Sequence, residues 1–124
     1  MNNCIFCNIP ENRIVNEYKY FYIIRDLYPV TNLHSLVIPK RHVVSYFECS
    51  KDEYEEIPII LNTQKTELKL TDGSITGFNI GMNIGEDAGQ TVFHFHIHII
   101  PRRKGDMQNP KGGIRGVIPG KQKY

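Results

Sequence analysis

The sequence of 124 residues has no tryptophan, only three cysteines, and no apolar run of the ~18 residues that a membrane-spanning helix needs. Three is an odd and small number of cysteines, which does not fit the disulfide framework of small secreted domains. The first residues lack the basic and apolar segments of a secretory signal. We therefore expect a cytoplasmic protein in a reducing compartment, with no membrane partner.

A strong charge of either sign is also missing. Lys and Arg number 15 against 13 Asp and Glu, so the net charge is +2, and we expect no nucleic-acid partner from so small a positive charge. A hydrophobic content of 40% in 124 residues suits one domain with one core. We expect residues 1–103 to form the body of this domain and residues 104–124, rich in glycine and basic residues, to form an irregular C-terminal tail.

Strands are predicted on both sides of a long helix. Segment 18–26 is rich in aromatic and β-branched residues, and segment 34–38 follows it across a short turn, which predicts an antiparallel hairpin. Segment 78–84 alternates and predicts a third strand, in which Gly81 marks a bulge or a close approach. This order of elements predicts an α+β fold with an antiparallel sheet.

The long helix is predicted to run from about Lys51 to Leu70. Ser50 and Glu53 have the spacing of a capping box, which predicts where the helix begins. Pro58 lies inside the predicted helix, where proline costs ~3 kcal/mol or bends the helix. We therefore expect a kink or a break near Glu55.

Histidines occupy every second position of one apolar segment: His94, His96 and His98. On a strand these three side chains would share one face, while residues 95, 97 and 99 would face a core. Pro101 is expected to end this strand. Imidazoles arranged in this way favour a metal site or a site of nucleophilic and proton-transfer chemistry over a merely polar surface.

A polar loop, residues 85–91, leads into the histidine segment. Gly85 and Gly89 allow backbone N–H groups to converge, and converging N–H groups bind anions. Gln90 and Thr91 add side-chain donors. Next to three histidines, this loop predicts a phosphate cradle beside a nucleophile.

Two cysteines near the N-terminus, Cys4 and Cys7, have the spacing of a zinc half-site. A tetrahedral site needs two more ligands, for which His42 and one of the strand histidines are candidates. The alternative is a pair of ordinary thiols without a metal.

The histidine segment, His94-Phe-His-Ile-His-Ile-Ile, resembles the histidine triad motif of the HIT family. Three further segments are similar to that family in order and spacing: 26–29, 34–42 and 83–91. The resemblance extends from about Cys4 to Arg102, and the tail resembles a prokaryotic-type branch that includes Hint-like and dinucleoside polyphosphate hydrolase-like members.

The resemblance implies a HIT-like sheet of about five antiparallel strands with one long and one short helix, and a homodimer in which two sheets join into one. It implies hydrolysis or nucleotidyl transfer at the α-phosphate of purine nucleoside phosphoramidates or dinucleoside polyphosphates. His96 would attack phosphorus and carry a covalent nucleotidyl intermediate. The alternatives are a nucleotide-sensing module with little turnover, or a metal-dependent hydrolase that uses all three histidines of the triad.

The resemblance also implies roles for single residues. His98 would contact phosphate and assist the leaving group, His34 would support the triad, and Asp26 would bind the ribose. The phosphate would be held by Asn83, Gly89, Gln90 and Thr91. The base would lie among Ile5, Phe6, Ile9 and Leu27. Zinc-bearing members are similar at Cys4, Cys7, His42 and His94, which implies one structural zinc per chain and no organic cofactor.

Overall fold

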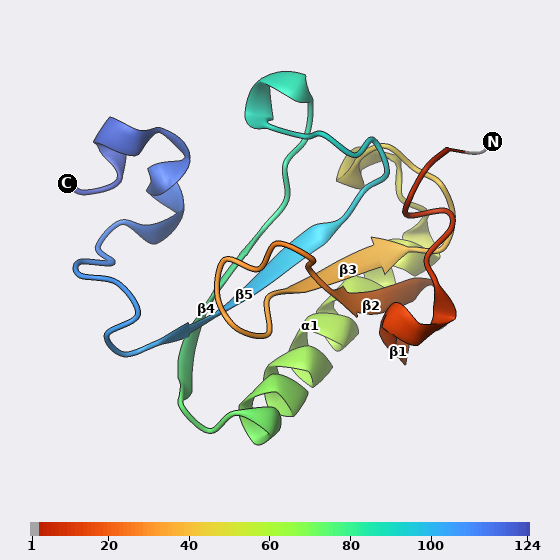
Figure 1. Cartoon of the computed structure of the whole chain (residues 1–124). Coiled ribbons are helices and arrows are strands. Elements are labelled where there is room, and N and C mark those ends of the chain that lie inside the picture. The colour runs from red at the N-terminus through yellow and green to blue at the C-terminus, as the bar shows by residue number, and fades with distance from the viewer. Residues whose placement is uncertain (1–2) are drawn as a thin grey trace.

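Five antiparallel strands form the sheet of the computed structural model, which describes residues 3–124 (Figure 1). Their order across the sheet is β1-β2-β3-β5-β4, so β1 and β4 are the edges. The strands are β1 (Ile14–Glu17), β2 (Phe21–Arg25), β3 (Ser35–Pro39), β4 (Ile75–Gly81) and β5 (Ile97–Arg103). One long helix, α1 (Lys51–Thr71), packs against one face of the sheet (Figure 1).

Helix α1 begins where the capping box predicts. The Ser50 hydroxyl accepts a hydrogen bond from the Glu53 N–H at 3.1 Å, and the Glu53 carboxylate accepts one from the Ser50 N–H at 2.7 Å. The expected break near Glu55 is wrong, because the helix continues through Pro58. Pro58 lies on the exposed side of the helix, so water can satisfy the Tyr54 carbonyl that loses its usual donor.

Short 3-10 turns take the place of the second, short helix that we expected. They are η1 (Glu11–Arg13), η2 (Tyr46–Glu48), η3 (Glu86–Ala88), η4 (Gly113–Val117) and η5 (Pro119–Lys121). The tail, which contains η4 and η5, lies at the opposite end of the molecule from the N-terminal segment (Figure 1).

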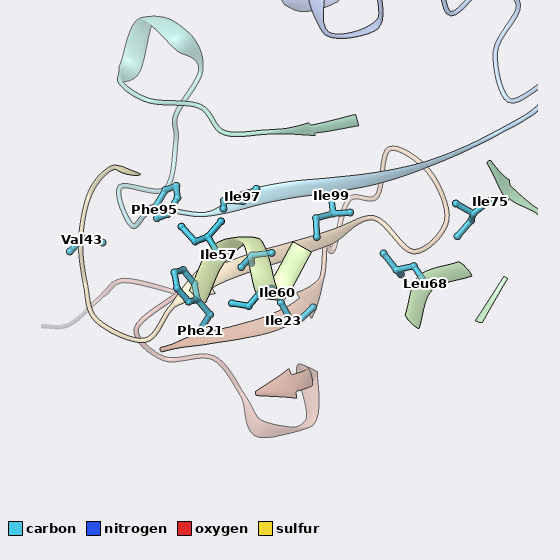
Figure 2. Close-up of a cluster of buried hydrophobic side chains, with 11 residues drawn as sticks. Phe21, Ile23, Val43, Ile57, Ile60, Leu68, Ile75, Phe95, Ile97 and Ile99 are labelled. Atoms are coloured by element: carbon cyan, nitrogen blue, oxygen red, sulfur yellow. The ribbon is translucent and has the colours of Figure 1, made fainter. Parts of the chain in front are cut away.

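The core lies between α1 and the sheet (Figure 2). Ile57, Ile60 and Leu68 of the helix pack against side chains of β2, β3 and β5. Residues 95, 97 and 99 all belong to this buried cluster, which confirms the predicted core face of the histidine segment. A smaller cluster on the other face consists of Phe6, Ile24, Leu36 and Ile38.

The end of β5 differs from the prediction. Pro101 does not end β5, which pairs with β4 as far as Arg103. The pairing with β3 ends at Ser35 and Ile99, so Pro101 needs no N–H donor on that side. Its carbonyl, which points to the same side, accepts a hydrogen bond of 2.6 Å from the Thr31 hydroxyl.

Gly81 marks a close approach and not a bulge. The irregular register of β4 lies at its other end, between Ile75 and Gly77. A Cβ atom at Gly81 would lie 3.3 Å from Cδ1 of Ile114, which belongs to η4. Within residues 3–124, no helix combines the length and the apolar character required to cross a bilayer.

Candidate functional site

A cavity of about 420 Å³ lies on the face of the sheet opposite α1. Three histidines line it, namely His34, His96 and His98, together with the loop residues Asn83, Gly89 and Thr91. Apolar side chains line it as well, from Ile5, Phe6 and Leu27. The cavity therefore combines imidazoles and glycine-bearing backbone with an apolar surface.

His94 does not share this cavity, contrary to the expected alternation of all three histidines on one face. The strand β5 begins only at Ile97, so the alternation does not extend back to His94. The preceding turn is held by the Phe95 N–H, which donates to the Val43 carbonyl at 2.7 Å. His94 is fully buried and faces the cysteines.

His96 presents a free lone pair. Its Nδ1 lies 2.9 Å from the His94 carbonyl oxygen, and a carbonyl can only accept a hydrogen bond. Nδ1 therefore carries the proton, and in the neutral ring Nε2 carries the lone pair. Phe6 packs edge-on against the His96 ring, with centroids 5.0 Å apart, and fixes its orientation.

His34 and His98 form a directed chain of hydrogen bonds. The Val30 N–H donates to Nδ1 of His34 at 3.0 Å, so the proton of the neutral His34 ring is on Nε2. That Nε2–H lies 2.9 Å from Nδ1 of His98 and donates to it. His98 consequently carries its own proton on Nε2. The cavity thus receives one imidazole with a lone pair and one with an N–H donor.

Burial keeps both members of this chain neutral. It lowers the pKa of His98 to about 4, with smaller contributions from the positive charges that His96 and His34 acquire on protonation. Burial also lowers the pKa of His34, partly offset by the Asp26 carboxylate. At neutral pH the two rings act as hydrogen-bond donors and acceptors without charge.

Asp26 lies at the end of β2, beside His34. Its Oδ1 accepts the Tyr28 N–H at 2.8 Å, and its Oδ2 lies 3.5 Å from Nε2 of His34. The carboxylate lines the cavity along with Leu27 and keeps acceptor capacity for a hydroxyl group.

The loop before the histidines is held by Gln90. Its side-chain amide donates to the carbonyls of Val44 and Val92, and its oxygen accepts the Gly85 N–H at 2.9 Å. Both amide N–H groups are therefore used within the protein, so the expected direct donation from the Gln90 amide to phosphate does not match this arrangement. Gly89 adopts a φ of 93°, which glycine tolerates and which turns the backbone toward the cavity.

The lining differs from the expected one at Ile9, which is absent, and at five added residues: Arg13, Tyr28, Val30, Leu36 and Val92. Ile9 packs against the small apolar cluster around Phe6 and does not line the cavity. Arg13 does line it and was missed, since no sequence motif singles it out. Its guanidinium donates to the Arg25 carbonyl at 3.0 Å, one residue before Asp26.

Cys4, Cys7, His42 and His94 form a second cluster, with ligand atoms all within 4.8 Å of one another. Nδ1 of His94 lies 3.4 Å and 3.5 Å from the two sulfurs and 3.1 Å from Nδ1 of His42. A tetrahedral zinc site separates sulfur and nitrogen ligands by about 3.5 Å and two nitrogens by about 3.3 Å. The donor atoms and their separations fit zinc.

Hydrogen bonding also orients a ligand of this cluster. Nε2 of His94 donates to the Pro39 carbonyl at 2.8 Å, which leaves the lone pair on Nδ1, the atom that faces the cysteines. Burial, a hydrogen bond and the charge of Cys4 raise the pKa of Cys7, so a pair of thiolates here calls for a bound cation.

Asp26, His34 and His98 also bring three ligand atoms within 4.8 Å. The Val30 N–H, however, holds the proton of His34 on Nε2, the atom that would have to bind the metal. This second group is therefore built for hydrogen bonding. The three triad histidines do not converge on a common point either, because His94 faces the cysteines.

Comparison with known proteins gives a consistent result. The HIT domain model matches residues 8–105. "Protein hit" of Bacillus subtilis is 39% identical over 113 residues, which cover 84% of this chain and 74% of that protein. The chain belongs to the histidine triad, or HIT, family.

Solved structures share the α+β fold. A Zn-bound histidine triad family protein from Mycobacterium smegmatis matches with a TM-score of 0.76 and 35% identity, over 86% of this chain and 80% of that one. The Plasmodium falciparum diadenosine triphosphate hydrolase matches with a TM-score of 0.74 and 29% identity, over 82% and 68% of the two chains.

Proposed function

We propose that this protein is a nucleotide hydrolase or nucleotidyl transferase that acts at the α-phosphate of purine nucleoside phosphoramidates or dinucleoside polyphosphates. The observation that carries the proposal is the complementary protonation of two imidazoles in one cavity. His96 offers a lone pair and His98 offers an N–H, and each is fixed by a hydrogen bond behind it. A nucleophile beside a donor is what substitution at phosphorus requires.

In the first step, Nε2 of His96 forms a bond to the α-phosphorus while the bond from phosphorus to the leaving group breaks. The Nε2–H of His98 donates hydrogen bonds to the phosphoryl oxygens and to the leaving atom, and the departing group takes its proton from solvent, because the neutral His98 ring keeps its own. In the second step, water adds to phosphorus and releases a proton to solvent, the phosphorus–nitrogen bond breaks, and the mononucleotide is released. His96 is then neutral again.

The remaining lining residues divide the substrate between them. Asp26 accepts hydrogen bonds from the ribose hydroxyls, and Ile5, Phe6 and Leu27 contact the base. Asn83, Thr91 and the backbone at Gly89 contact phosphate. The fold similarity to a diadenosine triphosphate hydrolase supports this class of substrate.

Zinc and a second copy of the chain complete the proposal. Cys4, Cys7, His42 and His94 would hold one structural zinc per chain, which is supported by the Zn-bound mycobacterial relative. The strand β4 is an edge of the sheet with an exposed Ile80, so pairing of two β4 strands would join two sheets in a homodimer.

The test is turnover of a fluorogenic adenosine phosphoramidate and of diadenosine tetraphosphate by the wild-type protein and by His96→Ala. The proposal expects a burst of leaving group from the wild type and a trapped nucleotidyl-histidine after rapid acid quench. A protein that binds nucleotides with no burst and no trapped intermediate would instead be a nucleotide-sensing module.

A further inference from the structure

The metal cluster and the cavity share one short segment of chain. Phe6 lies between Cys4 and Cys7 in sequence, and it is buried at 7% exposure. Its ring packs edge-on against His94 at 6.0 Å and against His96 at 5.0 Å. Phe6 therefore touches a candidate metal ligand and the candidate nucleophile at once, and it lines the cavity.

Apart from the apolar packing of Phe6 and Ile9, the contacts of its two cysteines hold this segment to the rest of the protein. The Cys7 N–H donates to the Cys4 carbonyl at 3.1 Å and the Arg13 N–H to the Pro10 carbonyl at 3.0 Å, so these backbone hydrogen bonds are local. The side chains of Cys4 and Cys7 reach the rest of the protein at the two imidazoles of the cluster. A metal bound by these four groups would replace contacts of 3.2–3.5 Å with coordination bonds.

We propose that metal binding and nucleotide binding are coupled through Phe6. Ligation of Cys4 and Cys7 would fix the turn that carries Ile5 and Phe6, and so would build one wall of the cavity and hold the His96 ring. This inference rests on the proposed function, since it takes a nucleotide as the occupant of the cavity. Phe6 is then a positioning residue that links the two sites.

Coupling of this kind is reciprocal. If the metal strengthens nucleotide binding by a given factor, the nucleotide must strengthen metal binding by the same factor. We expect a factor of about five or more, within the usual range for coupled sites. The reciprocity provides an internal check that does not involve turnover.

The experiment measures binding of AMP by calorimetry, with zinc-loaded and metal-free protein, and binding of Zn²⁺ with and without AMP. Tighter AMP binding to the zinc-loaded form, and an equal gain in Zn²⁺ affinity with AMP, would support the coupling. Equal AMP affinity in both forms, or no AMP binding in either, would overturn it. Metal-dependent AMP binding without hydrolysis would leave the coupling in place and overturn the proposed reaction.

Two variants separate the wall from the metal. His42→Ala removes an exposed ligand that does not line the cavity, and it should bind AMP as weakly as the metal-free wild type. Phe6→Ala should retain zinc but bind AMP equally with and without it. A metal-dependent AMP affinity that persists in Phe6→Ala would refute the role of Phe6.

A nucleotide-independent measurement completes the test. Hydrogen exchange of the Ile5 and Phe6 amides, and the ¹⁵N resonances of the His96 ring, are followed as Zn²⁺ is added to metal-free protein. Slower exchange and shifted ring resonances at one equivalent are expected. If the ¹⁵N resonances of the His96 ring do not shift while zinc binds, the metal orders only the N-terminal segment and the coupling to His96 is refuted.

Discussion

Within residues 3–124, two clusters bring three or more ligand-type groups together, yet they are built for different tasks. In the cysteine cluster, the Pro39 carbonyl accepts a hydrogen bond from Nε2–H of His94. The lone pair of His94 is therefore on Nδ1 and points toward the two thiols. In the cavity, the Val30 N–H donates to Nδ1 of His34. The proton of His34 is therefore on Nε2, which donates to His98.

The difference teaches that a backbone group behind an imidazole decides what the imidazole can do. A carbonyl behind the ring yields a ligand or a nucleophile, as at His94 and His96. An N–H behind the ring yields a hydrogen-bond donor, as at His34. Proximity of His, Asp and Cys side chains is therefore not enough to define a metal site.

The largest expected effect is on the nucleophile side of the comparison. His96→Ala should lower turnover of the phosphoramidate by about 10³-fold or more, because removal of a covalent nucleophile removes the whole pathway. AMP should still bind within a few-fold of the wild-type affinity, because the apolar wall and Asp26 remain. Rapid-quench kinetics and calorimetry on the same preparations provide the two readouts.

His98→Gln is the matched control for that change. Its side-chain amide can accept from His34 through the oxygen and donate an N–H to phosphate, but it has no nitrogen that titrates. Turnover should fall less than in His96→Ala, and the nucleotidyl intermediate should still form. If both variants lose the intermediate equally, the division of roles between the two histidines is wrong.

The next effect concerns the metal. Zinc measured by mass spectrometry should be about one per chain in the wild type and absent in His42→Ala, with a thermal midpoint lower by about 10 °C. His34→Ala should retain the metal, because the second cluster is a hydrogen-bonded group. Loss of zinc from His34→Ala, or retention of zinc in His42→Ala, would contradict the assignment of the metal to the cysteine cluster.

Much of the fold follows from local patterns in the sequence. The capping box at Ser50 and Glu53 marks the start of α1, and apolar alternation marks the buried face of β5. The effects of Pro58 and Pro101 were harder to predict, because each depends on what lies beside it. Pro58 faces solvent, and Pro101 lies beyond the last pair between β3 and β5, which is Ser35 with Ile99.

The site was less predictable at the level of single atoms. Sequence spacing places His96 and His98 near a glycine-bearing loop, but it cannot reveal that the Gln90 amide is used up by backbone carbonyls. Arg13 lines the cavity because a turn brings it to the Arg25 carbonyl, and that contact has no sequence signature. Which nitrogen of His34 carries the proton is decided by a single hydrogen bond, from the Val30 N–H to Nδ1.

A smaller effect is expected from pH. The pKa of His98 is lowered to about 4 from an ordinary value of 6.5. Between these pH values His98 is protonated in the unfolded chain and neutral in the folded protein. The free energy of unfolding therefore rises with pH, and this contribution is lost as pH falls from about 6.5 to 4. His98→Gln should reduce this slope in urea titrations. Performed in His42→Ala, the comparison excludes acid release of metal, and an unchanged slope would contradict the neutral His34–His98 pair.

The smallest effect tests whether Asp26 serves the ribose or only His34. Asp26→Asn should weaken AMP binding by about tenfold, since a carboxylate that accepts from a hydroxyl contributes ~1.5 kcal/mol. The discriminating probe is 2′-deoxy-AMP. The wild type should lose affinity for this probe relative to AMP, whereas Asp26→Asn should not distinguish the two ligands. If both proteins show the same loss, the carboxylate acts through its contact with the neutral His34, whose Nε2 lies 3.5 Å from Oδ2, and the hydrogen-bonded cluster extends to three groups.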